Sequence, residues 1–226
     1  MKKKFYLVLD VETANSTDDA LVYDIGFAVC DRSGKIYECD SFIVSDIFCD
    51  EPDLMSSAYY AQKIPQSLEG IDNGDFRVKS FYEARAAILA AMKKWNVEAV
   101  CAYNAHFDTT ALNTTERWLT KSKYRYFLPY GTKIFCIWHM ACQTLCMQKS
   151  FARFCHEHGM ESASGNIKTS AEAVYAYMNL NPDFDVYIEV QIMAKCFRQH
   201  KKMDKSINRL CWRIPQAQAK KINAGA

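Results

Sequence analysis

Two carboxylates close an unusually apolar segment near the start of the chain. Residues 5–15 read FYLVLDVETAN, so Asp10 and Glu12 follow five apolar residues with one apolar residue between them. Side chains alternate between the two faces of a strand, which points both carboxylates to the same side. Like charges this close repel unless a cation lies between them, and Mg²⁺ prefers oxygen ligands. The pair therefore indicates either a divalent-metal site at a sheet edge or simply two surface acids at a strand end.

Two further acids stand where they could join this pair. A second apolar segment, AVCAY, ends at Asn104, and Asp108 follows four residues later, where a helix is expected to begin. Asp185 opens the last long helical pattern. Each acid could extend the metal site, or could only stabilise the dipole at a helix N-terminus.

The elements that must position these residues follow from hydrophobic periodicity. Residues 50–75, with two prolines and an Asn-Gly turn signal, are expected to be irregular, and Thr169 with Glu172 has the spacing of a capping box. A β-hairpin followed by alternating helices and strands indicates a single α/β domain. Strands are expected over 4–12, 21–32, 35–44 and 97–104, and helices over 80–96, from near 107 through 120, and over 137–146, 150–159, 169–179 and 185–202.

The charge distribution adds a candidate partner. The 226 residues carry a net charge of only +2, but nine lysines and arginines lie between Lys195 and Lys221, against the single acid Asp204. Phe197 and Trp212 are interleaved with them, a composition that suits a phosphate backbone as well as a solvated helix face. We therefore divide the chain into a domain over 1–203 and a basic C-terminal tail over 204–226.

Several protein classes are disfavoured. The apolar run after MKKK stops at Asp10, too short for a signal peptide, and no stretch approaches a membrane span, so a cytoplasmic protein is expected. Its ten cysteines are then expected to be reduced and mostly buried. No glycine-rich phosphate loop is present. A zinc site or buried thiols could each explain one group of residues, namely Cys142, Cys146, Cys155 and His158.

Three segments together resemble a known family. DVET at 10–13, AYNAHFD at 102–108 and DVYIEVQIMAKCF at 185–197 are similar to the three exonuclease motifs of the DEDD superfamily, the proofreading-type 3′→5′ exonucleases. The resemblance spans roughly residues 4–197, and YGTKIFCIWHMAC and NRLCWRIP are similar to small stand-alone phage exonucleases of that family. It implies a ribonuclease H-like fold: a mixed sheet, with an N-terminal antiparallel hairpin plus parallel strands, flanked by helices.

The resemblance also implies an activity. Asp10, Glu12, Asp108 and Asp185 would hold two Mg²⁺ or Mn²⁺ ions that activate a water and stabilise the oxygens exchanged at the terminal phosphate. The implied substrate is the 3′ end of single-stranded DNA. RNA trimming is left open, as is a nucleic-acid-binding protein on the same fold that has lost catalysis. By the same resemblance, Thr13, Ala14 and Asn15 would meet the 3′-terminal nucleotide, and Asn104 and Phe107 would hold or stack on the strand.

One feature of the family is missing. The histidine branch places a general base five residues before the last aspartate, where this chain has Leu180, and the tyrosine branch places one four residues before, where it has Asn181. A short loop is absent before Asp185 relative to the family pattern. The favoured interpretation is a mobile loop that the sequence as given lacks. The alternatives are a real deletion that cripples catalysis, or a different base such as His106 or His158.

Overall fold

The computed structural model describes residues 3–58, 61–179, 185–199 and 202–223. The strands are β1 Phe5–Ala14, β2 Leu21–Asp31, β3 Ile36–Val44, β4 Val78–Lys79, β5 Ala99–Ala102 and β6 Ile134–Cys136. The helices are α1 Ser45–Phe48, α2 Pro52–Met55, η1 Ala61–Lys63, α3 Ile64–Asp72, α4 Phe81–Trp95, α5 Ala105–Thr120, α6 Ile137–Gln143, α7 Lys149–Glu157, α8 Ala171–Tyr177, α9 Asp185–Gln199 and α10 Arg213–Asn223. No helix among the described residues is long and apolar enough to cross a bilayer.

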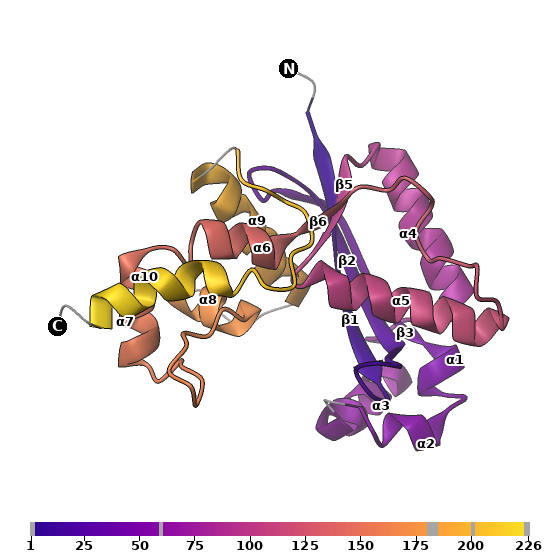
Figure 1. Ribbon diagram of the computed structural model, residues 1–226. Coiled ribbons are helices and arrows are strands. Elements are labelled where there is room, and N and C mark those ends of the chain that lie inside the picture. The colour runs from indigo at the N-terminus through magenta and orange to yellow at the C-terminus, as the bar shows by residue number, and fades with distance from the viewer. Residues whose placement is uncertain (1–2, 59–60, 180–184, 200–201, 224–226) are drawn as a thin grey trace.

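The strands form one six-stranded mixed sheet in the order β4-β3-β2-β1-β5-β6. β1, β2 and β3 are antiparallel neighbours, whereas β5 pairs parallel with both β1 and β6. Helices cover both faces, with α4 and α5 on one side of the strands and α6 to α10 on the other (Figure 1). The predicted mixed sheet of hairpin plus parallel strands is therefore confirmed.

The alternation of side chains along β1 divides the core into two layers. Leu7, Leu9 and Val11 belong to the cluster that includes the buried face of α4 and α5. Tyr6 and Val8 point the other way, into the cluster built with α6 to α9. The strand is apolar on both faces because both faces are covered, as is usual for a central strand of an α/β sheet.

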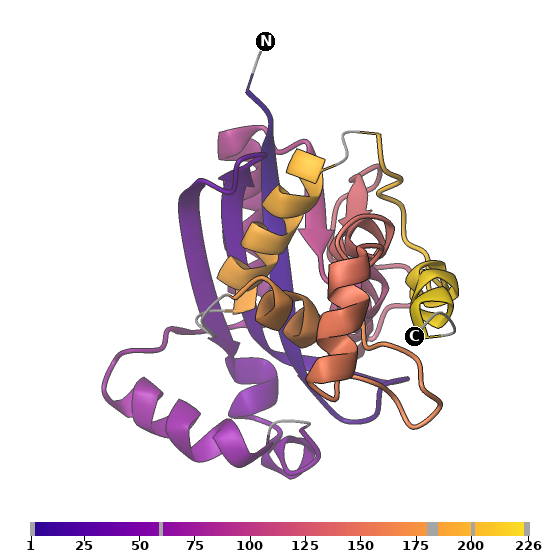
Figure 2. The same cartoon turned by 90° about the vertical axis from the view of Figure 1, so that its left-hand side faces the viewer.

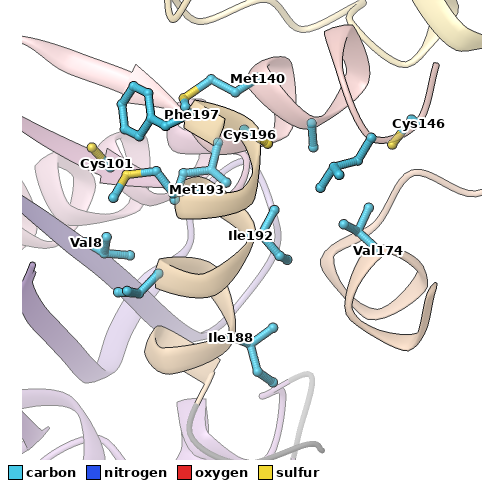
Figure 3. Close-up of a cluster of buried hydrophobic side chains, with 14 of the residues drawn as sticks. Val8, Cys101, Met140, Cys146, Val174, Ile188, Ile192, Met193, Cys196 and Phe197 are labelled. Atoms are coloured by element: carbon cyan, nitrogen blue, oxygen red, sulfur yellow. The ribbon is translucent and has the colours of Figure 1, made fainter. Parts of the chain in front are cut away.

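Helix α9 provides most of the second layer. It lies across the strands on one face of the sheet (Figure 2). Figure 3 shows Met193 directed toward Cys101 and Val8 of the sheet, and Ile192 directed toward Val174 of α8. The side chains of Met193 and Ile192 are fully buried, so α9 joins the sheet to the α8 layer. Its first residue is Asp185, and the packing of α9 thereby sets where that residue stands.

Two local predictions were wrong. Residues 50–75 are not irregular, because they contain α2, η1 and α3. Pro52 and Pro65 lie in the first turns of α2 and α3, where a missing backbone N–H costs no helical hydrogen bond. The N-cap of α8 is Ser170 and not Thr169. The Ser170 Oγ accepts a hydrogen bond from the Ala173 N–H at 3.4 Å. Thr169 is buried and serves another contact, described below.

The C-terminal segment packs against the helical layer. The Gln216 side chain on α10 accepts from the Ile167 N–H and donates to the Ile167 carbonyl, both at 3.0 Å. Upstream, the Cys136 N–H donates to the carbonyl of Lys205 at 2.8 Å. The Arg209, Arg213 and Lys220 side chains remain exposed on this segment.

A glycine on β2 permits the close approach of α9. A Cβ added at Gly26 would stand 2.9 Å from Cγ2 of Val186, the second residue of α9. Val186 is buried and β-branched, so it has little freedom to move away.

We expect Gly26→Ala to lower the free energy of unfolding by about 1–3 kcal/mol, because overpacking forces α9 away from the sheet. Adding Val186→Ala to that variant should recover part of the loss, although Val186→Ala alone is destabilising. Urea denaturation of the four proteins in this double-mutant cycle measures the coupling. Strictly additive effects would show that this contact does not limit the approach of α9.

Candidate active site

Asp10 and Glu12 lie at the C-terminal end of β1, on the face that α9 covers. They continue the alternating row begun by Tyr6 and Val8, and both are half-buried. The pairing of β1 with β2 shifts register directly after Glu12. Such a bulge re-aims the side chains beside it and is common next to functional sites.

A fifth acid, Asp24, stands across from this row. Asp24 is the cross-strand partner of Glu12 in the β1–β2 register, so the two side chains point to the same face. Sequence reasoning missed this residue. Aligning the first two predicted strands, 4–12 and 21–32, residue by residue was the only signal that could have found it, and the register shift after Glu12 obscures that alignment.

Asp108 brings a carboxylate to the same place from a different element. β5 runs parallel to β1, with Cys101 opposite Val8, and ends just before Asn104. Asn104 is the N-cap of α5 and has a left-handed backbone with φ of 63°, a conformation that asparagine tolerates. The chain thus turns sharply from β5 into α5, and Asp108 falls in its first turn, directed inward with 3% exposure.

The electrostatics of Asp108 are unfavourable in the protein alone. Burial and the nearby charges of Asp10 and Glu12 raise the pKa of Asp108 well above its usual value, against the opposing effect of hydrogen bonds from the backbone of Asp108 and Val11. Among the described residues, Oδ2 of Asp108 is buried without a hydrogen-bond partner. A buried carboxylate oxygen without a donor is costly and calls for a partner.

A cation would resolve both problems, since it neutralises like charges and takes an oxygen ligand. The described side chains do not by themselves form a group of three or more His, Cys, Asp or Glu that could hold a metal ion. The side chain of the fourth predicted ligand, Asp185, lies outside the described residues, although its backbone begins α9. Carboxylates are the ligand type that a divalent cation prefers, and the ligand roles of Asp10, Glu12, Asp108 and Asp185 stay a prediction.

A buried carboxylate on α9 joins the two sides of the site. Glu189, one turn after Asp185 and 4% exposed, accepts the backbone N–H of Tyr103 with both carboxylate oxygens, each at 3.1 Å. Tyr103 immediately precedes the Asn104 cap of α5. Glu189 therefore connects the helix that begins with Asp185 to the turn that places Asp108.

Tyr103 is held a second time by the segment before α8. Its hydroxyl donates to the Thr169 carbonyl at 2.6 Å, and the Thr169 hydroxyl accepts the indole N–H of Trp138 at 2.9 Å. These buried contacts explain why Thr169 is not available as a helix cap. Neither Glu189 nor Tyr103 was singled out from the sequence, because only the tertiary structure brings them together.

The predicted substrate-binding residues flank the carboxylates. Thr13 and Ala14 end β1, where Ala14 is fully buried and pairs with Leu21. Asn15 is exposed with φ of 70°, and its N–H donates to the Ser57 hydroxyl at 2.9 Å.

The other two predicted contact residues lie at the start of α5. The Phe107 N–H donates to the Asn104 carbonyl at 2.7 Å. The Phe107 ring is partly buried against the core layer of α4 and α5. The substrate roles of all five residues remain predictions.

The structure bears on the missing general base. The segment directly before Asp185, residues 180–184, lies outside the described residues, so the interpretation of a loop that the sequence as given lacks stays a prediction. His158 is the C-cap of α7 and stacks on Phe154 of the same helix, with 4.2 Å between ring centroids. His106 lies two positions before Asp108 in α5, about 200° away around the helix, and so on the opposite side. Leu180 and Asn181 lie outside the described residues.

The alternative zinc site is wrong for the described residues. Cys142 and Cys146 are fully buried in the core, whereas Cys155 faces the Lys168 carbonyl and His158 contacts only its own helix. Burial raises the pKa of the Cys155 thiol to about 12, which also argues against a thiolate nucleophile. Buried thiols, the simpler interpretation, describe these cysteines.

Comparison with known proteins supports the fold. No family model and no curated protein matches the sequence. Among solved structures, apo exonuclease I has 14% identity and a TM-score of 0.55, over 89% of this chain and 43% of that one. E. coli exonuclease I in complex with a dA16 oligonucleotide has 11% identity and a TM-score of 0.56, over 88% of this chain and 42% of that one. The product-bound exonuclease I has 13% identity and a TM-score of 0.52, over 87% of this chain and 44% of that one.

The chain thus spans less than half the length of the exonuclease I structures that it matches. At these identities the likeness concerns the fold. The mixed sheet with helices on both faces matches the ribonuclease H-like exonuclease fold, as the three motifs implied.

Replacing Asp108 by asparagine should separate charge repulsion from metal binding. In EDTA at pH 8 we expect Asp108→Asn to be at least as stable as the wild-type protein, because it removes a buried charge beside two others. Added Mg²⁺ should raise the melting temperature of the wild-type protein and that of the variant much less. Equal Mg²⁺ responses would exclude Asp108 as a ligand.

We expect Glu189 to stabilise the fold through its carboxylate oxygens, which accept the Tyr103 N–H. Glu189→Ala leaves the buried Tyr103 N–H unpaired and should cost about 1–3 kcal/mol, whereas Glu189→Gln keeps one acceptor and should cost less. If Glu189 positions the carboxylates, the alanine variant should also need more Mg²⁺ for half-maximal stabilisation. A glutamine variant as impaired as the alanine variant would assign the effect to the negative charge instead.

Proposed function

We propose that the protein is a metal-dependent 3′→5′ exonuclease that hydrolyses phosphodiester bonds at single-stranded DNA 3′ ends, and that it belongs to the DEDD superfamily. The observation that supports this most is the buried, unpartnered oxygen of Asp108 among the charges of Asp10 and Glu12. It occurs on a fold shared with exonuclease I. Strongly perturbed carboxyl groups that gather at one place are typical of functional sites.

Asp10, Glu12, Asp108 and Asp185 would hold two Mg²⁺ or Mn²⁺ ions. When bound, such ions lower the pKa of a water and stabilise charge on the attacking and leaving oxygens of the phosphate. The contribution of the protein would be rigidity, because a central strand, the first turn of α5 and the packed helix α9 carry the carboxylates.

The residues around the carboxylates would bind and orient the substrate. Thr13, the backbone of Ala14 and the exposed Asn15 would contact the terminal nucleotide on one side. Asn104 and the partly exposed Phe107 would hold or stack on the strand on the other, which is a sequence-tolerant contact suited to degradation. The exposed cations of the C-terminal segment 204–226, outside the domain over 1–203, would attract the phosphate backbone.

If the deletion before Asp185 is real, the enzyme lacks its histidine or tyrosine base. A positioned base usually contributes 10²–10⁴-fold, so turnover is then expected to be lower than that of a complete site by about that factor. A real deletion would also favour the second candidate function, a nucleic-acid-binding protein on the same fold. An exoribonuclease is the alternative within the class, decided by contacts to the sugar 2′ position.

The decisive experiment incubates the protein with 5′-labelled single-stranded DNA and RNA in Mg²⁺, Mn²⁺ or EDTA. We expect a descending ladder from the 3′ end that requires metal, is stopped by a 3′-phosphorothioate cap and disappears in Asp10→Ala. The matched control is Asp72→Ala, an exposed acid at the end of α3. Intact substrate in every condition, together with salt-dependent binding, would favour the binding protein.

A further inference from the structure

The end of α5 and the loop that follows it form a surface of one charge. Residues 117–133, here called the α5–β6 surface, read RWLTKSKYRYFLPYGTK. They contain five cations and no acid: Arg117, Lys121, Lys123, Arg125 and Lys133. Of the ion pairs within the described part of the chain, only that of Lys133 with Glu98, at 3.4 Å, involves these cations. Cations that gather on one loop without acids among them raise the local positive potential and fit a polyanion.

Three tyrosines on the same surface are turned into solvent. Tyr124 is 88% exposed, Tyr126 is 57% exposed and Tyr130 is fully exposed. Large aromatic side chains seldom stand this far from the core unless they contact a partner. Their alternation with cations along 121–130 is the composition of a base-stacking surface, in which rings meet bases and cations meet phosphates.

The tyrosines are displayed on a fixed scaffold. Phe127, between them in the chain, is fully buried and packs on Phe81 of α4 with 5.2 Å between ring centroids. The Phe127 N–H donates to the side-chain carbonyl of Asn113 on α5 at 2.9 Å. The Arg117 guanidinium lies 4.9 Å from the ring centre of Tyr126, which holds that ring in place. Little entropy would be lost when such a surface binds.

A hollow separates the loop from α5. It has a volume of about 470 Å³, and its lining includes Thr109, Leu112, Tyr126, Leu128 and Tyr130. The lining is mainly apolar, so it suits a flat ring rather than a phosphate. Thr109 directly follows Asp108, and Asn113 lies about 7.5 Å farther along the helix axis than Asp108. The hollow therefore begins at the end of α5 that carries the candidate active site.

We propose that the α5–β6 surface binds the single-stranded part of a nucleic-acid substrate, upstream of the nucleotide at the carboxylates. The position of the strand, upstream of the carboxylates, rests on the proposed function, whereas the binding of nucleic acid to this surface does not. The surface favours nucleic acid over a protein partner because all five charges have one sign and the rings are spaced by cations. In Figure 1 the loop runs from the far end of α5 back to β6, on the side away from α6 to α10.

Binding is tested first, without catalysis. Fluorescence anisotropy of 5′-labelled oligo(dT) in EDTA compares the wild-type protein with a triple variant, Tyr124→Ala, Tyr126→Ala and Tyr130→Ala. We expect affinity to fall about 10-fold or more, the scale of losing one or two stacked bases. The triple phenylalanine variant keeps the rings and should bind like the wild-type protein. The matched control for general charge is Lys149→Ala with Arg153→Ala, two exposed cations on α7.

A charge variant provides an independent readout. Lys121→Ala, Lys123→Ala and Arg125→Ala should flatten the dependence of log affinity on log salt by about 0.7 for each phosphate that the protein no longer neutralises. An unchanged slope and unchanged affinity in both triple variants would overturn the proposal. A variant that changes the oligomeric state at low salt, with DNA binding intact, would assign the surface to a second copy of the chain and also overturn it.

Turnover separates this proposal from the proposed function. The triple alanine variant should degrade long oligonucleotides more slowly yet cleave the p-nitrophenyl ester of thymidine 5′-monophosphate, which has no upstream strand, at the wild-type rate. If the wild-type protein cleaves neither substrate, the exonuclease assignment fails while the anisotropy result still decides the binding surface. Equal loss on both substrates would place the effect in the active site and not on this surface.

Discussion

Repulsion between carboxylates held together at the end of β1 is the constraint on which this molecule depends. Asp108 is buried beside the charges of Asp10 and Glu12, with one oxygen that has no donor among the described residues. Such a group weakens the folded state unless packing elsewhere compensates. The compensation is visible in β1, whose side chains are buried in both core layers, and in α9, which approaches closely over Gly26.

Two buried carboxylates near this place have opposite surroundings. Glu189 satisfies both oxygens on the Tyr103 N–H and so acts as part of the scaffold. Asp108 leaves an oxygen without a donor among the described residues and so acts as a candidate ligand. A buried carboxylate whose oxygens accept hydrogen bonds fixes one arrangement of the elements around it. A buried carboxylate oxygen without a donor destabilises the fold until a ligand pairs with it. Thr169 and Trp138 extend the satisfied side of this network to α6 and α8.

The small net charge conceals a strong asymmetry. Residues 45–75 contain seven acids and a single lysine, whereas residues 117–133 contain five cations and no acid. The first segment follows β3 and the second runs from the end of α5 to β6. Figure 1 shows α1 to α3 below the sheet and the loop after α5 beside it. A polyanion is repelled by the first segment and attracted by the second, so the charge distribution favours some directions of approach over others.

Much of the fold could be predicted because it follows from local rules. Period-two alternation placed Asp10 and Glu12 on one face, helical spacing located the long helices, and three motif segments in order implied the mixed sheet. The errors came where a distant contact outweighed a local signal. Pro52 and Pro65 start helices rather than interrupt them. Thr169 is drawn into the contact with Tyr103, which leaves the cap of α8 to Ser170.

The sequence by itself therefore determined which residue types stand at strand ends and helix starts, since backbone geometry repeats every two or 3.6 residues. Only the tertiary structure decided that Asp24 faces Glu12, that Glu189 holds Tyr103, and that Asp108 is buried with an oxygen that no described residue pairs. These properties depend on strand register and on packing between distant segments, such as those of Tyr103 and Glu189, which lie 86 residues apart in the chain. No local pattern encodes such contacts, because their free energy arises only when the elements meet.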